Sequence, residues 1–213
     1  MTIRFAGAAA LGVGVLLAFG VAATHPAGHE SGDPHALALL SGAVHAIAVF
    51  GQALLSFGAL AMTRIVWREE HAGAWFAFIL FAFGSVAAIS AAMMSGFITP
   101  LYMTAPAGTS AALLDVLREI ARMSMRINQA FGFTHQFFVA GAVLVWSLSW
   151  PRGGAGAAAL QIGGIVAGLG SLALLSWLLY GGHRLDPHMF AVVTIAQALW
   201  LLGAAAALAT RRD

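Results

Sequence analysis

The chain has 213 residues, of which 61% are hydrophobic and only 8% are charged, and its mean hydropathy is +0.89. A soluble domain is about one-quarter charged, so this composition excludes a water-soluble globular protein. It predicts an all-α membrane protein that crosses the bilayer several times. The chain has neither cysteine nor lysine, which excludes disulfides, thiolate metal sites and a lysine Schiff base. Its few basic residues, all arginine, give no support to nucleic-acid binding.

Six segments are long and apolar enough to span a membrane, since a spanning helix needs about 20 apolar residues. Together they form one integral membrane domain over residues 1–213. The spans are expected at about residues 5–23, 36–62, 73–97, 128–149, 157–180 and 188–209. The connections between the spans hold nearly all of the charged residues.

The first span has two interpretations. Its apolar run follows the positively charged start MTIR and ends at Val21-Ala22-Ala23, which resembles a signal-peptidase site. The run has about 18 residues, which is long for the apolar region of a signal peptide. We therefore expect an uncleaved helix, with cleavage as the alternative.

Two outer connections, THPAGHESGDPH and GGHRLDPHMF, are rich in histidine. Each contains Asp-Pro-His, and because Asp is a strong N-cap and Pro suits the first helical turn, each is expected to begin a helix. Convergence and internal duplication both explain the repeat. A helix N-terminus favours neutral imidazole, the form that binds metals. The candidate ligands for Cu(II), Zn or Ni are His29, His35, His183, His188, Asp33 and Asp186; a solvated loop is the alternative.

The strongly polar side chains of the second span share one face. At 100° per residue, they fall within an arc of about 60°, and they are Ser41, His45, Gln52, Ser56 and Thr63. Polar groups inside a membrane are costly and face the bundle interior or a cavity. This stripe is therefore expected to line a ligand site or a proton path, or to form hydrogen bonds between helices.

Small residues recur every four positions in two spans. They are Gly84, Ala88, Ala92 and Gly96 in the third span, and Gly164 and Gly168 in the fifth. Because small residues let helix backbones approach closely in lipid, these patterns predict tight helix seams.

A separate amphipathic helix is expected over residues 109–127, with Thr109 or Ser110 as its N-cap. Its apolar face comprises Leu113, Leu117, Ile120 and Ile127, and a charged line comprises Arg118, Arg122 and Arg126. Such a helix is expected to lie at the membrane interface. Its arginines would contact lipid phosphates or an acidic partner subunit.

The fourth span begins with a second polar face. In NQAFGFTHQFF, Asn128 and His135 lie seven residues apart, and so do Gln129 and Gln136. Seven residues is nearly two turns, so each pair shares one side of the helix. His45 and His135 are expected at similar depths on different spans, where two imidazoles could bind haem b, or hold a Cu or Zn ion. The candidate cofactor-binding residues are His45, His135, Ser41, Gln52, Asn128 and Gln136; hydrogen bonding within the bundle is the alternative.

The arginines predict how the chain is oriented. One side holds Arg4, Arg64, Arg68, Arg152, Arg211 and Arg212, and the other holds Arg118, Arg122, Arg126 and Arg184. Positively charged short loops stay in the cytoplasm. We therefore expect a multi-pass protein of the cell (inner) membrane with both termini cytoplasmic.

No nucleotide-binding, serine-hydrolase or zinc-protease motif occurs, and the spans contain no Asp or Glu that could relay protons. Three hypotheses of function follow. The first is a redox or metal/haem-handling membrane protein with an intramembrane histidine site and a histidine-rich outer face. The second is a non-catalytic accessory subunit of a larger membrane complex. Besides the lipid bilayer, the expected partners are other membrane subunits or further copies of the chain in a homo-oligomer. The third is a membrane enzyme or carrier for a small apolar ligand, lipid-like or quinone-like. The first is preferred because the second does not explain the histidines.

Overall fold

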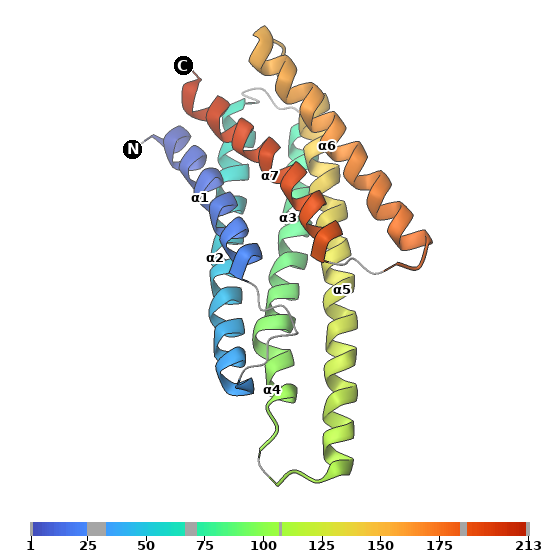
Figure 1. Ribbon diagram of the computed structural model, residues 1–213. Coiled ribbons are helices and arrows are strands. Elements are labelled where there is room, and N and C mark those ends of the chain that lie inside the picture. Colours follow the sequence, from blue (N-terminus) through green and yellow to red (C-terminus); the bar gives the residue numbers. More distant parts are fainter. Residues whose placement is uncertain (1, 25–32, 67–71, 107, 184–186, 212–213) are drawn as a thin grey trace.

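The computed structural model describes residues 2–24, 33–66, 72–106, 108–183 and 187–211 of the chain, and this part is built of helices (Figure 1). Six helices among the described residues are long and apolar enough to cross a membrane, which confirms the predicted class of fold. The elements are α1 (Ile3–Thr24), α2 (Pro34–Val66), α3 (Ala72–Met93), the π-helix η1 (Met94–Ile98), α4 (Thr99–Met103), α5 (Ala111–Leu148), α6 (Gly154–Tyr180) and α7 (Pro187–Thr210).

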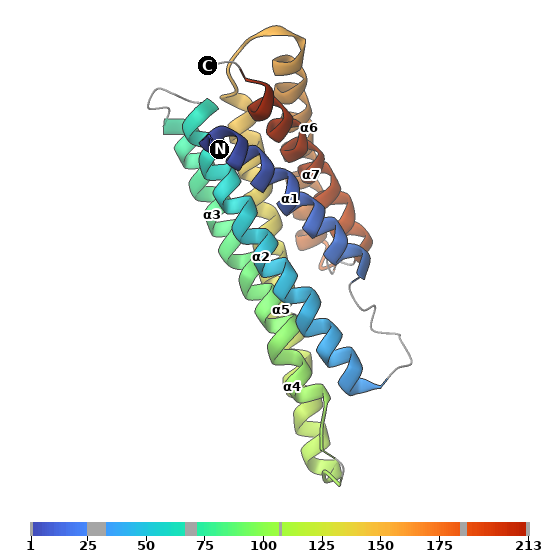
Figure 2. The same ribbon diagram turned by 90° about the vertical axis from the view of Figure 1, so that its left-hand side faces the viewer.

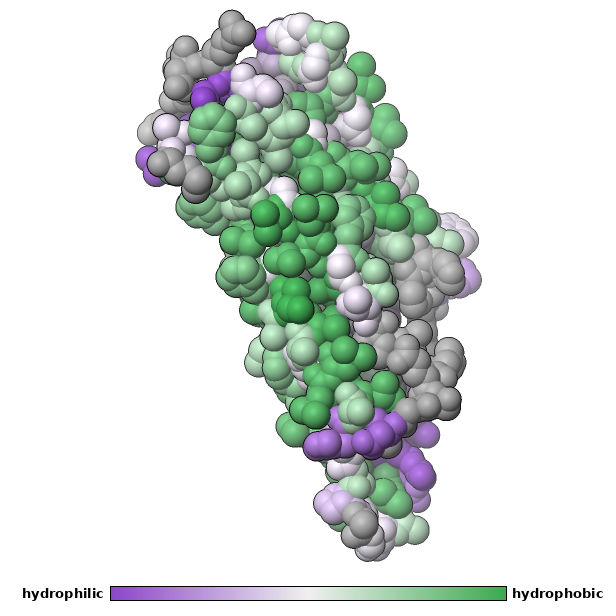
Figure 3. Space-filling model, turned by 60° about the vertical axis from the view of Figure 1, so that its left-hand side comes forward, coloured by the Kyte–Doolittle hydropathy of each residue, from purple (hydrophilic) through white to green (hydrophobic). Residues whose placement is uncertain are grey.

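The six long helices close a ring in the order α1, α2, α3, α5, α6, α7. Both termini lie at one end of this ring, called here the terminal end; the opposite end is the distal end (Figure 1). Arg4 donates a hydrogen bond to the Arg211 carbonyl, and Arg211 donates to the Val66 carbonyl at 3.2 Å. Three of the helix ends that were predicted to share a side are thus tied together. A broad apolar belt covers the visible face between hydrophilic groups at the two ends (Figure 3), as a lipid environment requires.

α1 packs closely on α2. A Cβ built on Gly14 would lie 2.7 Å from Leu55 Cγ, and one built on Gly58 would lie 2.6 Å from Leu11 Cγ. The backbones therefore approach as closely as glycine permits. This seam is not one of those predicted from the third and fifth spans. Its glycines lie on two different helices, Gly14 on α1 and Gly58 on α2, so they form no repeat within one span.

The helix expected over residues 109–127 is not separate from the fourth span. α5 runs without a break from Ala111 to Leu148, because no proline or glycine interrupts the chain where the two segments were expected to meet. Its 38 residues correspond to a length of about 57 Å, whereas the hydrocarbon core of a bilayer is about 30 Å thick. The first half of α5 therefore projects beyond the membrane instead of lying along its surface.

The third span also continues past its expected end, through a wide turn. Residues Met94–Ile98 are π-helical, and the Thr99 hydroxyl donates to the Met94 carbonyl at 2.7 Å. Pro100 follows within the first turn of α4, where a missing N–H costs little. A π-turn of this kind often occurs at functional sites, and here it contains Gly96.

Three helical segments extend past the distal ends of α1, α6 and α7, as both ribbon views show (Figures 1 and 2). The segments are the start of α2, the η1–α4 region and the first half of α5. They form what we call the distal extension: residues 34–44, 97–103 and 111–127. In the bundle proper, Phe81, Trp146 and Trp200 fill the core near the terminal end, with the rings of Trp146 and Trp200 stacked at 6.0 Å.

Candidate functional site

His45 lies where α2 crosses the π-turn that follows α3. Its side chain is 5% exposed, and its Nδ1 lies 2.7 Å from the Ser41 carbonyl oxygen. A carbonyl only accepts, so Nδ1 carries a proton and donates in this contact. The ring packs directly on Gly96, because a Cβ built there would lie 2.7 Å from His45 Cγ. The polar stripe thus faces the bundle interior, as predicted.

The rest of the stripe bonds to α3. Gln52 donates to the Ser85 hydroxyl at 2.8 Å, and the Ser56 hydroxyl lies 3.1 Å from the same oxygen. Ser41 donates to the Ser95 carbonyl at 3.3 Å. Hydrogen bonding between helices, one of the two expected roles of the stripe, therefore accounts for Gln52 and Ser56.

His135 lies on the face of α5 that packs against α3. Its Nδ1 lies 2.9 Å from the Gly84 carbonyl oxygen, so Nδ1 is again the donor. The residue is half-buried. Gly84 permits this approach, because a Cβ there would lie 3.0 Å from Val139 Cγ2 and 3.2 Å from the His135 carbonyl oxygen.

The two histidines do not face each other at one depth, which corrects the expected pairing. His135 binds α3 at Gly84, and His45 contacts it at Gly96. These glycines are twelve residues apart, a rise of about 18 Å along a helix. The sequence placed both at similar depth because it gave no sign that α2 extends past the distal end of α1 (Figure 1). The four-residue repeat also turns by about 40° per step, so its two ends face different helices, α5 and α2.

Gln136 forms a second buried polar contact, between α5 and α7. It is fully buried and donates to the Thr194 hydroxyl at 3.0 Å, while Gln197 donates to the Gln136 carbonyl at 3.3 Å. Among the described residues, the Gln136 Oε1 atom is buried without a hydrogen-bond partner. Asn128, the other candidate on this face, is half-buried near the distal end of the bundle.

The outer histidine cluster lies largely outside the described residues. His29 and Asp186 fall there, as does the side chain of His188. Asp33 accepts from the His35 N–H at 3.1 Å, which confirms the predicted N-cap of α2, and both residues are exposed. His183 is exposed and packs its ring 5.1 Å from that of Trp177. In the part of the chain that the structure describes, no three His, Asp or Glu side chains come together in a way that could hold a metal ion.

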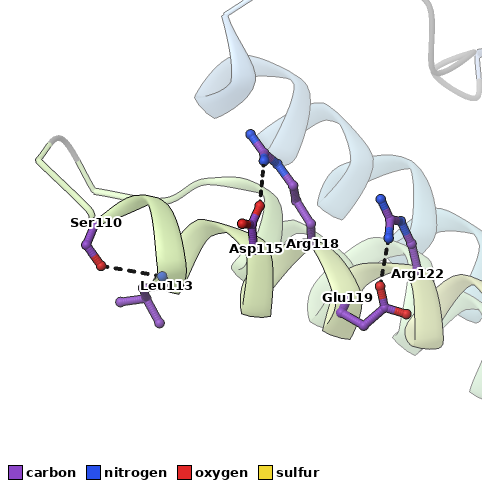
Figure 4. Close-up of polar contacts among 6 residues, drawn as sticks. All are labelled: Ser110, Leu113, Asp115, Arg118, Glu119 and Arg122. Atoms are coloured by element: carbon purple, nitrogen blue, oxygen red, sulfur yellow. Dashed lines mark hydrogen bonds and ion pairs between the residues drawn. The ribbon is translucent and has the colours of Figure 1, made fainter.

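The first half of α5 has one charged face whose ions pair along the helix. Ser110 caps the helix, accepting from the Leu113 N–H at 3.4 Å (Figure 4). Arg118 pairs with Asp115 at 2.9 Å, and Arg122 pairs with Glu119 at 2.7 Å (Figure 4). All four side chains are more than half exposed, so these pairs contribute little to stability. The pairs nevertheless neutralise much of the arginine line that was expected to meet lipid or an acidic partner.

A second face of this half-helix is apolar and uncovered. The side that packs on the rest of the distal extension carries Leu114, Leu117, Ala121 and Ser124. Beside it runs what we call the apolar stripe: Leu113, Val116, Ile120, Met123 and Ile127, each between 36% and 63% exposed. The apolar face expected from the sequence included Leu117, which is half-buried, and did not include Val116 and Met123. Their spacing of three and four residues was the signal that could have found them.

The fold and these sites define a multi-pass helical membrane protein with a helical extension at its distal end. Comparisons with protein-family models, curated proteins and solved structures find no match for the chain.

Proposed function

We propose that this protein is a non-catalytic membrane subunit that binds a partner helix through the first half of α5. The observation that carries this proposal is the apolar stripe. Five large side chains that repeat at intervals of three and four residues stand open on a helix that extends beyond the bilayer. An exposed apolar patch of this kind marks an interaction site in a natural protein.

Lipid tails do not explain the stripe. The charged residues Asp115, Arg118 and Glu119 alternate with it along the same turns of α5. The hydrocarbon core of a bilayer excludes such residues, so this part of α5 lies in water or among headgroups. An apolar face in that setting is stabilised when another protein surface covers it.

The spacing of the stripe favours a helix as the covering element. Intervals of three and four residues keep a seam on one side of a helix that pairs with another helix along its length. The interior of the bundle supports a structural role, since the described hydrogen bonds of Gln52, Ser56 and Gln136 join helix to helix.

The test compares two methionines of α5. Met123 lies in the apolar stripe and is 63% exposed, whereas Met125 is 50% exposed but lies outside it. We expect the protein extracted in mild detergent to have a mass above that of one 22.0 kDa chain. Met123→Glu should reduce it to a single chain and Met125→Glu should not. A wild-type protein that is a single chain in native-lipid discs would refute the proposal.

For localisation, we propose the cell (inner) membrane with both termini cytoplasmic. The support is that Arg4 and Arg211 lie together at the terminal end, with Arg64 in the last turn of α2, whereas Arg118 and Arg122 lie at the distal end. Positively charged short loops favour the cytoplasm. Labelling of single cysteines at Thr2 and Leu113 with a membrane-impermeant reagent tests this, since only Leu113→Cys should react in intact cells.

Redox or metal/haem handling is a second candidate function, with haem b or a Cu or Zn ion as its cofactor. What favours it is the state of both membrane histidines, His45 and His135. Each donates Nδ1–H to a backbone carbonyl, as metal-ligating histidines do with the ring nitrogen that does not bind the metal. Each would have to act on its own, given their separation along α3.

An absorption spectrum and a metal analysis of the purified protein test this candidate. A Soret band or a stoichiometric metal that disappears in His135→Leu would support it. Protein that carries neither haem nor metal after expression with both supplied would rule it out.

A further inference from the structure

We infer that the partner covering the apolar stripe is a second copy of this chain, which forms a parallel two-helix seam along the first half of α5. This inference rests on the proposed function and names its partner. It follows from the side chains in the stripe, the orientation that a shared membrane imposes, and the charges that flank the stripe.

The residues of the stripe suit a two-stranded seam. With Leu113, Ile120 and Ile127 at the first core position of the heptad, Val116 and Met123 occupy the second. β-Branched isoleucine at the first position and a residue without β-branching at the second favour two parallel strands. Ile120, Met123 and Ile127 follow this pattern, whereas Leu113 and Val116 at the start of the seam depart from it.

A shared membrane supplies the matching orientation. Two copies inserted in one bilayer have the same sidedness, so their α5 helices run parallel. Twofold symmetry is the commonest symmetry of homo-oligomers. A twofold axis along the membrane normal places the stripe of one copy opposite the stripe of the other. Within the first half of α5, Leu114, Leu117 and Ala121 pack inward on the same chain, so the stripe is the apolar side of this half-helix that is left for a second copy.

The flanking charges permit self-association. In a parallel pair, the residues beside the core on one helix meet those on the other side of its partner. One flank of the stripe carries Glu119 and Arg126, and the other carries Leu117 and Ser124. Identical copies therefore bring no two like charges together across the seam. The paired Asp115–Arg118 and Glu119–Arg122 ions also leave little net charge to attract a charged partner instead (Figure 4).

The same face continues toward the bilayer with small residues. Ala130 and Thr134 follow Ile127 at intervals of three and four, and both are exposed. Where the two helices enter the membrane, small residues let their backbones stay close. The seam can therefore run from the extension into the bilayer without a break.

The absence of cysteine from the chain permits a direct test. Single variants Val116→Cys, Met123→Cys and Met125→Cys are oxidised in native membranes and analysed on a non-reducing gel. Residues facing each other across the axis come within the Cα separation of about 7 Å that a disulfide tolerates, so Met123→Cys should give about tenfold more dimer than Met125→Cys. Two differently tagged copies, expressed together, should also purify together, and Met123→Glu should abolish this.

The outcomes separate the two proposals. If Met123→Glu reduces the mass of the assembly but no cysteine of the stripe links to itself and tagged copies do not associate, the partner is another protein; the inference then fails and the proposed function stands. If the wild type is a single chain in native-lipid discs, both fail. Dimers of equal yield at all three cysteines would show random collision and would also overturn the inference.

Discussion

Replacing Gly96 with alanine tests the position of His45 directly. The new Cβ would lie 2.7 Å from His45 Cγ and closer still to His45 Cβ. The Cβ atom cannot rotate away, because it is bonded directly to the backbone of α2. The helices must separate, and overpacking of this kind costs about 1–3 kcal/mol.

The part of this destabilisation that comes from contact with His45 is measured by a double-mutant cycle. The second variant is His45→Gly, which removes both the imidazole ring and Cβ. If the contact causes the destabilisation, Gly96→Ala should cost almost nothing in the His45→Gly background. The coupling would then fall within the range of about 0.5–3 kcal/mol seen for residues in contact. Gly163→Ala is the matched control, because nothing lies within 4 Å of a Cβ at Gly163. It should be neutral or slightly stabilising through its helix propensity.

The assay is reversible unfolding of the purified protein in mixed micelles with increasing denaturing detergent, followed by circular dichroism. Additive effects of Gly96→Ala and His45→Gly would refute the reasoning, since they would show that the imidazole does not pack on Gly96. A neutral Gly96→Ala would refute it as well, and would remove the structural account of why a histidine is buried at this place.

Three further predictions concern other contacts in the bundle. Gly168→Leu should destabilise by about 1–3 kcal/mol or more, because a Cβ there would lie 2.7 Å from Leu144 Cβ, whereas Gly163→Leu should unfold like the wild type; equal losses would argue against the α5–α6 seam. Gln52→Leu should lower the free energy of unfolding by only about 0.6 kcal/mol, the mean for a hydrogen bond in a membrane protein, because the Ser85 hydroxyl keeps its bonds to Phe81 and Ser56. A loss of stability several times larger in the same unfolding assay would indicate a further role for Gln52. Ser110→Ala should remove the N-cap of α5 at a cost of about 1 kcal/mol and speed amide exchange over residues 111–114, whereas Thr109→Ala should not; unchanged exchange in Ser110→Ala would contradict the cap.

The membrane class and the number of spans were predictable, because burial in lipid needs only length and apolarity, both of which are local properties. The helix starts at Pro34 and Pro187 were predictable for a similar reason, since an N-cap and a proline act within one turn. The inward face of Gln52 and Thr63 followed from the periodicity of the helix. In each case the relevant energy is determined by neighbours along the chain.

The tertiary structure decided which faces meet. The depth of His45 depends on how far α2 extends past α1, and α1 sets that level by packing its glycines on Leu55 and Ala61. The different partners of Gly84 and Gly96 depend on the rotation of α3 between α5 and α2. The spacing of the apolar residues in this half of α5 is present in the sequence, but only the packing of Leu117 and Ala121 on the neighbouring segments separates the covered residues from the stripe. The sequence by itself determined that this half of α5 is amphipathic; which part of its apolar arc is left uncovered depends on the helices beside it, and that is a property of the assembled bundle alone.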